Sequence, residues 1–244
     1  MQDEVLKHTK KIIKTMGNKN HSFTDKLKEI GIEILIIVFA VTLSIKLHEW
    51  SEHRHQQKEA KEFLSDLRKD LADDIENMTA LQKQLSSTIE DKTYMLKMTE
   101  FQYDSMRNSN DSVNFKILVQ NKMTISGLSR SNISGNYEGF KSSGKIGFIE
   151  NKKIKILMLK YYQQLIPTIS EAEKYYNLNL SNSGDAAAQL SGEGKKGKEI
   201  LLNPKMKFYY NVTLIQASNI INSYNELIKT AKELDSNISK EIDL

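Results

Sequence analysis

Two imidazoles and a carboxylate follow one another closely in the first quarter of the sequence. His48, Glu52 and His55 are separated by four and three residues, a spacing that puts all three on one face of a helix. Two histidines and one carboxylate form a ligand set that suits Zn²⁺, so these residues are a candidate metal site, within one chain or across a dimer. The alternative, which we favour, is that they are simply hydrated, and we expect no metal and no cofactor.

A second polar group lies in the middle of the sequence, where residues 136–149 read NYEGFKSSGKIGFI. This composition predicts a short helix that stops at Gly144. Its polar side chains and backbone N–H groups could face a ligand or a glycan strand, and the candidate binding residues are Tyr137, Glu138, Lys141, Ser142 and Gly144. In the structural alternative, Tyr137 and Phe140 dock the helix onto longer helices and Gly144 is its left-handed cap. Lys141 and Ser142 would then help to close the helix.

Enzyme chemistry finds few of its usual residues in this chain. There is no cysteine, and all five histidines precede residue 56. The remaining residues therefore lack the thiolate nucleophile and the side chain that serves most often as a general base. Ser142 and Lys145 could form a nucleophile and its base, but no glycine elbow accompanies them. We expect no catalytic residues and a protein that is not an enzyme.

The apolar segment before these groups predicts a transmembrane helix over residues 30–47, which read IGIEILIIVFAVTLSIKL. Its length, about 1.5 Å per residue or roughly 27 Å, is close to a hydrocarbon core of about 30 Å. Ala40 and Ser44 form a small-xxx-small pair that could bring two such helices together. The predicted membrane anchor is a run of six apolar residues and an interfacial indole: Ile34, Leu35, Ile36, Ile37, Val38, Phe39 and Trp50.

Two other interpretations of this segment are weaker. A core helix of a soluble protein would also be apolar, but the rest of the chain is polar and heptad-like. A cleaved signal peptide would be followed by small residues, whereas KLHEWSEHRH is bulky and charged.

Lysine and arginine predict the orientation. Residues 10–29 contain six lysines, whereas residues 47–66 contain only Arg54, Lys58 and Lys61. The richer side stays in the cytoplasm, so 1–29 is predicted to be a cytoplasmic basic segment and 48–244 an extracytoplasmic domain. Residues 56–244 carry 26 basic and 24 acidic side chains. Because this balance offers little attraction to phosphates, we expect no nucleic-acid partner.

The extracytoplasmic part is predicted to be helical. Only two prolines, Pro167 and Pro204, interrupt the chain, and Pro167 should kink or end the helix that contains it. The first stripe of apolar residues at spacings of three and four continues the membrane helix: Leu64, Leu67, Leu71, Ile75, Met78, Leu81, Leu85 and Ile89. Similar stripes predict a helix after Asn151, which would cap it, and a last helix from about residue 205 to the end. The apolar residues predicted to line one face of the last helix are Val212, Ile215, Ile220, Tyr224, Leu227, Ala231, Leu234 and Ile238.

One segment is predicted to be a flexible loop, 181–198, because it holds four glycines and few bulky residues. The sequence as a whole predicts an all-α fold. In it, a single transmembrane helix continues into an elongated antiparallel helical bundle with coiled-coil-like packing.

Two stretches resemble an uncharacterised single-pass envelope membrane protein family of Bacteroidota. The first runs from the apolar helix through HEWSEHRHQQKEAKEFLSDLRKDLADDIENM. Trp50 and Glu52 match the family there, while His48, Glu49 and Ser51 depart from its usual asparagines. The second is the segment of Tyr137, Glu138, Lys141, Ser142 and Gly144, with Phe140 in place of a leucine. The resemblance covers about residues 25–165. It implies a single-pass inner-membrane protein with a helical periplasmic domain and no assigned activity.

These observations lead us to expect a membrane-anchored helical scaffold or protein-interaction subunit of a bacterial cell envelope. Its partners would be the lipid bilayer and either another protein or further copies of itself. The alternative is a periplasmic domain that senses a ligand or glycan. Because residues 1–29 are too few for a signalling domain, such a sensor would have to signal through a partner.

Overall fold

The described part of the chain is mostly helical, with short turns and connectors between the helices. The computed structural model describes residues 7, 9–11, 14, 23–108, 119, 122–123, 126–130 and 134–242, and none of these lies in a β-strand. The chain divides into two compact units, Met1–Glu59 and Ala60–Leu244. The longest helix, α2 (Phe23–Lys97), contributes to both. The prediction that nothing stops this helix between Leu47 and Lys92 is confirmed.

The first unit contains a long apolar helix with little protein around it. An 18-residue window of this helix has a mean hydropathy of 2.3, and only 6% of the window is buried. Leu35 and Phe39 are among its exposed large side chains. Thr42, inside the window, satisfies its hydroxyl by donating to the Val38 carbonyl oxygen at 2.8 Å. By length and composition this helix could cross a membrane.

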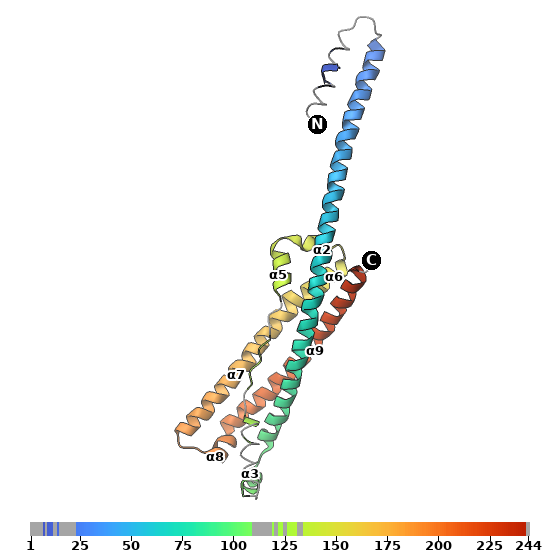
Figure 1. The fold of residues 1–244 in the computed structure, drawn as a ribbon. Coiled ribbons are helices and arrows are strands. Elements are labelled where there is room, and N and C mark those ends of the chain that lie inside the picture. Colours follow the sequence, from blue (N-terminus) through green and yellow to red (C-terminus); the bar gives the residue numbers. More distant parts are fainter. Residues whose placement is uncertain are drawn as a thin grey trace. The chain divides into compact units, whose positions relative to one another are not determined.

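Three long helices share one core in the second unit (Figure 1): α2, α7 (Ile166–Gly192) and α9 (Pro204–Ile242). Hydrogen bonds give their directions. Arg68 Nε reaches Asp235 Oδ1 at 2.7 Å, and Lys207 Nζ reaches the Met98 carbonyl oxygen at 3.2 Å, so α9 runs antiparallel to α2. Asn179 Nδ2 donates to Thr213 Oγ1 at 2.8 Å between α7 and α9.

Most of the predicted apolar stripes form this core. On α2 the buried members are Leu64, Leu67, Leu71, Met78, Leu81 and Leu85. On α9 they are Ile220, Tyr224, Leu227, Ala231, Leu234 and Ile238. Full burial of one such side chain is worth about 1.5–3 kcal/mol, so these stripes hold the three helices together. Ile215 is the exception: it was predicted to face the core and is instead exposed.

Shorter elements return the chain from the end of α2 to its middle. After α3 (Glu100–Arg107), Lys122 Nζ bonds Asp91 at 2.8 Å, Gln84 bonds the Gly127 carbonyl at 3.1 Å, and Asn136 bonds Asp70 at 3.0 Å. Since the partner numbers fall as the chain advances, this return runs antiparallel along α2. It leads into α5 (Gly135–Ser142) and the 3₁₀ turn η1 (Lys145–Phe148). The turn replaces the extended connector expected there.

A π-helical turn joins two helices around Pro167. Helix α6 (Lys152–Leu159) begins at Asn151, whose side chain accepts from the backbone N–H groups of the second and third residues that follow, so its predicted capping role is confirmed. The π-helical turn η2 (Lys160–Leu165) then leads into α7. Pro167 has no N–H to offer the carbonyl one turn earlier and its ring crowds that carbonyl. A wider turn relieves this conflict without ending the helix.

The predicted flexible loop at 181–198 is wrong over most of its length. Helix α7 continues to Gly192, and the short helix α8 (Gly197–Leu201) follows before α9 (Figure 1). Burial of Ser183, Ala186 and Leu190 keeps this stretch helical, because packing overrides the cost of a helical glycine at position 184. The helix closes at Gly194, with φ of 84°, whose N–H bonds the Ser191 carbonyl at 3.0 Å.

Two glycine substitutions test this helix end. Gly194→Ala should lower the free energy of unfolding by about 1–2 kcal/mol, because the alanine Cβ is strained in a left-handed backbone conformation. Gly192→Ala should raise it by at most about 0.5–1 kcal/mol, since that glycine is the last residue of α7 and has open space around a new Cβ. Denaturant unfolding of the two variants measures both changes. Equal effects would show that the helix does not end at Gly194.

Candidate functional site

The predicted binding element around α5 is packed on its inner side. Tyr137 is fully buried, its ring stacks on Tyr162 at 4.4 Å, and its hydroxyl accepts from Gln163 Nε2 at 2.8 Å. Phe140 stacks on Phe63 of α2 at 3.9 Å between ring centroids. The structural alternative therefore describes both aromatic residues.

The other residues of the element lie at its surface. Glu138 and Lys141 form an ion pair at 3.6 Å, and Ser142 is exposed. Gly144 has φ of 74°, and its N–H bonds the Lys141 carbonyl at 3.0 Å, so the predicted left-handed cap is confirmed. A binding role for these four residues stays a prediction.

The histidine group does not come together as a metal site. Glu52 Oε1 accepts from Gln56 Nε2 at 3.3 Å, and His55 Nε2 lies 3.4 Å from Glu59 Oε1. Across the described residues, no group of three or more His, Cys, Asp or Glu side chains is placed to hold a metal ion. His48, Glu52 and His55 share a helical face, but Glu52 and His55 each interact with another residue of the same helix.

A buried ion pair lies at the centre of the second unit. Arg130 Nε lies 3.1 Å from Glu173 Oε1, and the two side chains are only 7% and 11% exposed. Arg130 also donates to Ser170 Oγ at 2.8 Å, and the Tyr224 hydroxyl donates to the same glutamate oxygen at 2.6 Å. These bonds tie the return segment, α7 and α9 together. Breaking such a pair by removing one partner typically costs about 3–5 kcal/mol.

A second buried acid, Asp74 of α2, faces the π-helical turn. Its Oδ2 accepts from the Tyr161 hydroxyl at 2.9 Å, while its Oδ1 is buried and has no hydrogen-bond partner among the described residues. Burial raises the pKa of Asp74 to about 6, although the Tyr161 hydroxyl and the positive Arg130 act in the opposite sense. Burial also raises the pKa of Tyr161, so the tyrosine stays protonated and donates to the carboxylate.

Sequence analysis missed Arg130, Glu173 and Asp74. Two of them did leave a signal, because each carboxylate occupies a core position of an apolar stripe. Asp74 falls three residues after Leu71 and four before Met78, and Glu173 falls midway between Ile169 and Tyr176. An acid at such a position needs a partner when it is buried. Arg130 left no comparable signal, since it lies outside any periodic segment.

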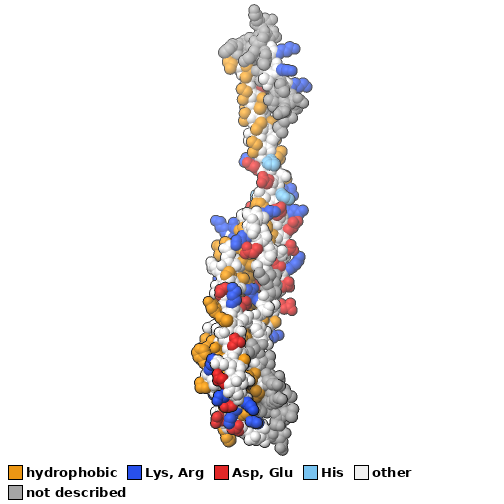
Figure 2. Space-filling view, turned by 90° about the vertical axis from the view of Figure 1, so that its left-hand side faces the viewer, with side chains coloured by type: hydrophobic (Ala, Val, Ile, Leu, Met, Phe, Trp, Pro, Cys, Tyr) orange, Lys and Arg blue, Asp and Glu red, His pale blue; other side chains and the backbone are white. Residues whose placement is uncertain are grey.

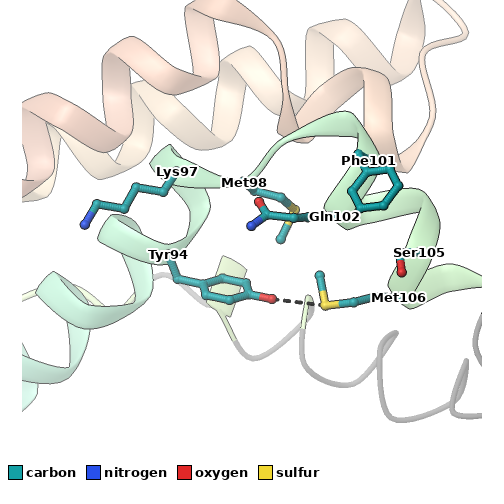
Figure 3. Close-up of a pocket in the computed structure, with 7 residues that line it drawn as sticks. All are labelled: Tyr94, Lys97, Met98, Phe101, Gln102, Ser105 and Met106. Carbon is teal, nitrogen blue, oxygen red and sulfur yellow. Dashed lines mark hydrogen bonds between the residues drawn. The ribbon is translucent and has the colours of Figure 1, made fainter.

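Two hollows lie at the surface. One, of about 400 Å³, lies between the last turn of α2 and helix α3 and is lined by residues of both (Figure 3). Across its floor the Tyr94 hydroxyl contacts Met106 Sδ at 3.2 Å, and Lys97 brings the one charge in its lining (Figure 3). Another of about 410 Å³ lies between α2 and α9 and is lined by residues that include Arg68 and Asp235. Neither is lined by Asp74 or Glu173.

The outer face of α7 and α9 carries large apolar side chains that no other helix covers. Tyr175 and Leu178 lie three residues apart on α7, and Phe208 and Ile215 lie seven apart on α9, so each pair shares a helical face. All four are 55–63% exposed. The bond between Asn179 and Thr213 puts Leu178 and Ile215 at one level. We call these four residues the apolar strip; hydrophobic side chains gather along one edge of this unit in Figure 2.

Comparisons with protein-family models, with curated proteins and with solved structures found no match. The resemblance to the Bacteroidota envelope family therefore stays an expectation from the sequence.

Replacing the buried acid tests its electrostatic environment. The folded pKa of Asp74 is about 6 and its ordinary value is 3.8. Between these pH values the folded protein keeps a proton that the unfolded chain has released, so this group lowers stability as the pH rises from about 4 to 6. The loss amounts to at most about 3 kcal/mol.

Asp74→Asn should abolish this part of the pH dependence, because the amide oxygen still accepts from Tyr161 and carries no charge. Denaturant unfolding at several pH values measures it. Asp73→Asn, at an exposed neighbouring carboxylate, is the control and should keep the wild-type slope. The same slope in Asp74→Asn and wild type would show that Asp74 is not the titrating group.

Proposed function

We propose that this protein is a single-pass inner-membrane protein whose helical bundle, on the periplasmic side, self-associates as a non-enzymatic scaffold of the cell envelope. Support for the membrane anchor comes from the long apolar helix, of which only 6% of an 18-residue window is buried. Lipid would cover what protein leaves bare. The six lysines in residues 10–29 support a cytoplasmic N-terminus.

The single observation that carries an interaction role is the apolar strip. Its four side chains are large and exposed, two on each of α7 and α9, while the core beneath them is already filled by other residues. Soluble monomeric domains rarely leave a large contiguous apolar patch exposed. A patch made by two rigid helices presents a fixed shape, which favours a protein partner over a small flexible ligand.

A second copy of the chain is the occupant that the surface favours. Lys174, next to Tyr175 of the strip, is paired with Glu171 of its own helix at 2.6 Å, so this lysine would add no net charge to a contact between two copies. An apolar face also suits the self-complementary contact of a two-fold dimer. Anchoring in one bilayer raises the effective concentration of copies, and Ala40 with Ser44 allows close approach of two membrane helices.

The ligand-sensing alternative has less support from the geometry. Two hollows of about 400 and 410 Å³ are open and lie at the surface, whereas binding sites for small molecules usually enclose most of the ligand.

The membrane proposal predicts which ends of the chain are reachable from outside. The sequence has no cysteine, so single substitutions can be labelled without background. In cells with a permeabilised outer membrane, Ser87→Cys should react with a membrane-impermeant maleimide and Gln2→Cys should react only after lysis. Release of the unlabelled chain by alkaline carbonate, or the reverse labelling pattern, would contradict the anchor or its orientation.

The strip proposal predicts a cross-link between copies. Asn182 is exposed and lies on α7 beside the strip, so Asn182→Cys should form a disulfide dimer in oxidised membranes. Adding Leu178→Glu and Ile215→Glu should abolish that dimer, because four carboxylates would meet in the interface. Both replaced side chains are exposed, so the fold should lose little stability.

The matched control is Ser87→Cys on α2, which is exposed and polar and should give no dimer under the same oxidation. Denaturing gels report the doubled mass. An Asn182→Cys dimer that survives the two glutamates would place self-association elsewhere. A cross-link to a different protein instead would overturn self-association and leave the membrane anchor standing.

A further inference from the structure

A small cavity lies between α2, α7 and α9, close to Met123 of the return segment. Its lining includes Lys92, Ser183, Gly184, Ala187 and Tyr210, and its volume is about 30 Å³. One water molecule needs roughly 10–15 Å³ by a comparable measure. The cavity therefore admits one small occupant. Gly184 and Ala187 help to leave this space, because neither has a side chain long enough to fill it.

Lys92 places a buried ammonium group in this lining. The side chain is 5% exposed, and its Nζ donates to the Lys122 carbonyl oxygen at 2.8 Å. Nζ also lies 6.0 Å from the centre of the Tyr210 ring. An ammonium group has three N–H donors, so this carbonyl satisfies one of them. Burial lowers the pKa of Lys92, which is the expected result when a charge loses water without gaining a full set of partners.

The neighbouring charges do not neutralise Lys92. Asp91 acts on it favourably and Lys122 unfavourably, and these two already pair with each other at 2.8 Å. Lys122 also lies over the Tyr94 ring at 5.0 Å. Among the described residues, Asp91 and Lys122 together carry no net charge, so these two and Lys92 sum to one positive charge.

Tyr210 supplies a second donor. Its side chain is 3% exposed, and its hydroxyl is buried without a hydrogen-bond partner among the described residues. Burial raises the pKa of Tyr210 to about 12, so the hydroxyl keeps its proton at neutral pH. An unmade bond of this kind costs about 1–3 kcal/mol, which an acceptor inside the cavity would recover.

We propose that this cavity is a binding site for one monatomic halide, chloride under physiological conditions, held by Lys92 Nζ and the Tyr210 hydroxyl. The two donors need an acceptor, the leftover positive charge needs a negative one, and the volume excludes phosphate or sulfate. Water would satisfy the donors but would bring two protons of its own and no charge. A bound halide would join α2 to α9 inside the unit and so stabilise the folded state.

Bromide provides the probe. Thermal unfolding of the detergent-solubilised full chain is followed in sodium bromide and, at equal ionic strength, in sodium gluconate. The folding equilibrium constant should rise linearly with bromide, as one plus its concentration divided by Kd, so the midpoint temperature should keep climbing above Kd. Lys92→Met and Tyr210→Phe should each abolish this bromide-dependent rise, the second without removing a charge.

Lys83→Met is the matched control. This lysine lies on the same helix and is exposed, so the variant removes an equal charge and should respond to bromide as the wild type does. Crystals grown in bromide should show an anomalous peak within hydrogen-bond distance of Lys92 Nζ. A rise that is equal in Lys92→Met and Lys83→Met, or a cavity with no anomalous peak, would overturn the proposal. Neither outcome bears on self-association through the apolar strip.

Discussion

Arg130 and Glu173 form an ion pair that is almost entirely withdrawn from solvent, and three segments of the chain must be in place for it to exist. The return segment brings the guanidinium, α7 brings the carboxylate, and Tyr224 of α9 donates to the same oxygen. A shift of α7 or α9 along its axis would leave a charge or a hydroxyl buried and alone. An axial shift of one helix costs little where apolar stripes meet, because one apolar contact replaces another. The same shift breaks these buried bonds, which is costly. The ion pair thus sets the register that the hydrophobic core leaves open.

Much of the fold could be predicted because it depends on local pattern. The helix spacing of the apolar residues of α2 and α9, the cap at Asn151 and the left-handed glycine at 144 each follow from a few neighbouring residues. The end of α7 could not be predicted in this way. Four glycines in residues 181–198 favour a loop by composition, and only the burial of residues such as Leu190 against other helices decides for a helix.

The candidate site divides along the same line. A short helix closing at Gly144 was predicted, and docking of Tyr137 onto a longer helix was one of the two alternatives, but its partner ring, Tyr162, could not be named from the sequence. Lys92 occupies a core position of the α2 stripe, seven residues after Leu85, but its burial was not predicted, because lysine is among the residues least often found inside proteins. The exposure of Ile215 is equally hidden: the residue fits the periodic pattern of α9 and yet faces outward. The burial or exposure of such side chains depends on contacts between distant segments, and the periodicity of one helix carries no information about those contacts.

The π-helical turn at Lys160–Leu165 holds one residue more per turn than the helices on either side of it. That surplus turns α7 by roughly 100° relative to the face that α6 alone would have continued. Adjacent tyrosines, 161 and 162, can both lie inside the protein for this reason. The buried face therefore shifts around the helix axis at this turn. An insertion or deletion between Lys160 and Leu165 would rotate Ile169, Glu173 and Tyr176 out of the interior as a group. Sequence length is therefore constrained at this turn more tightly than residue type.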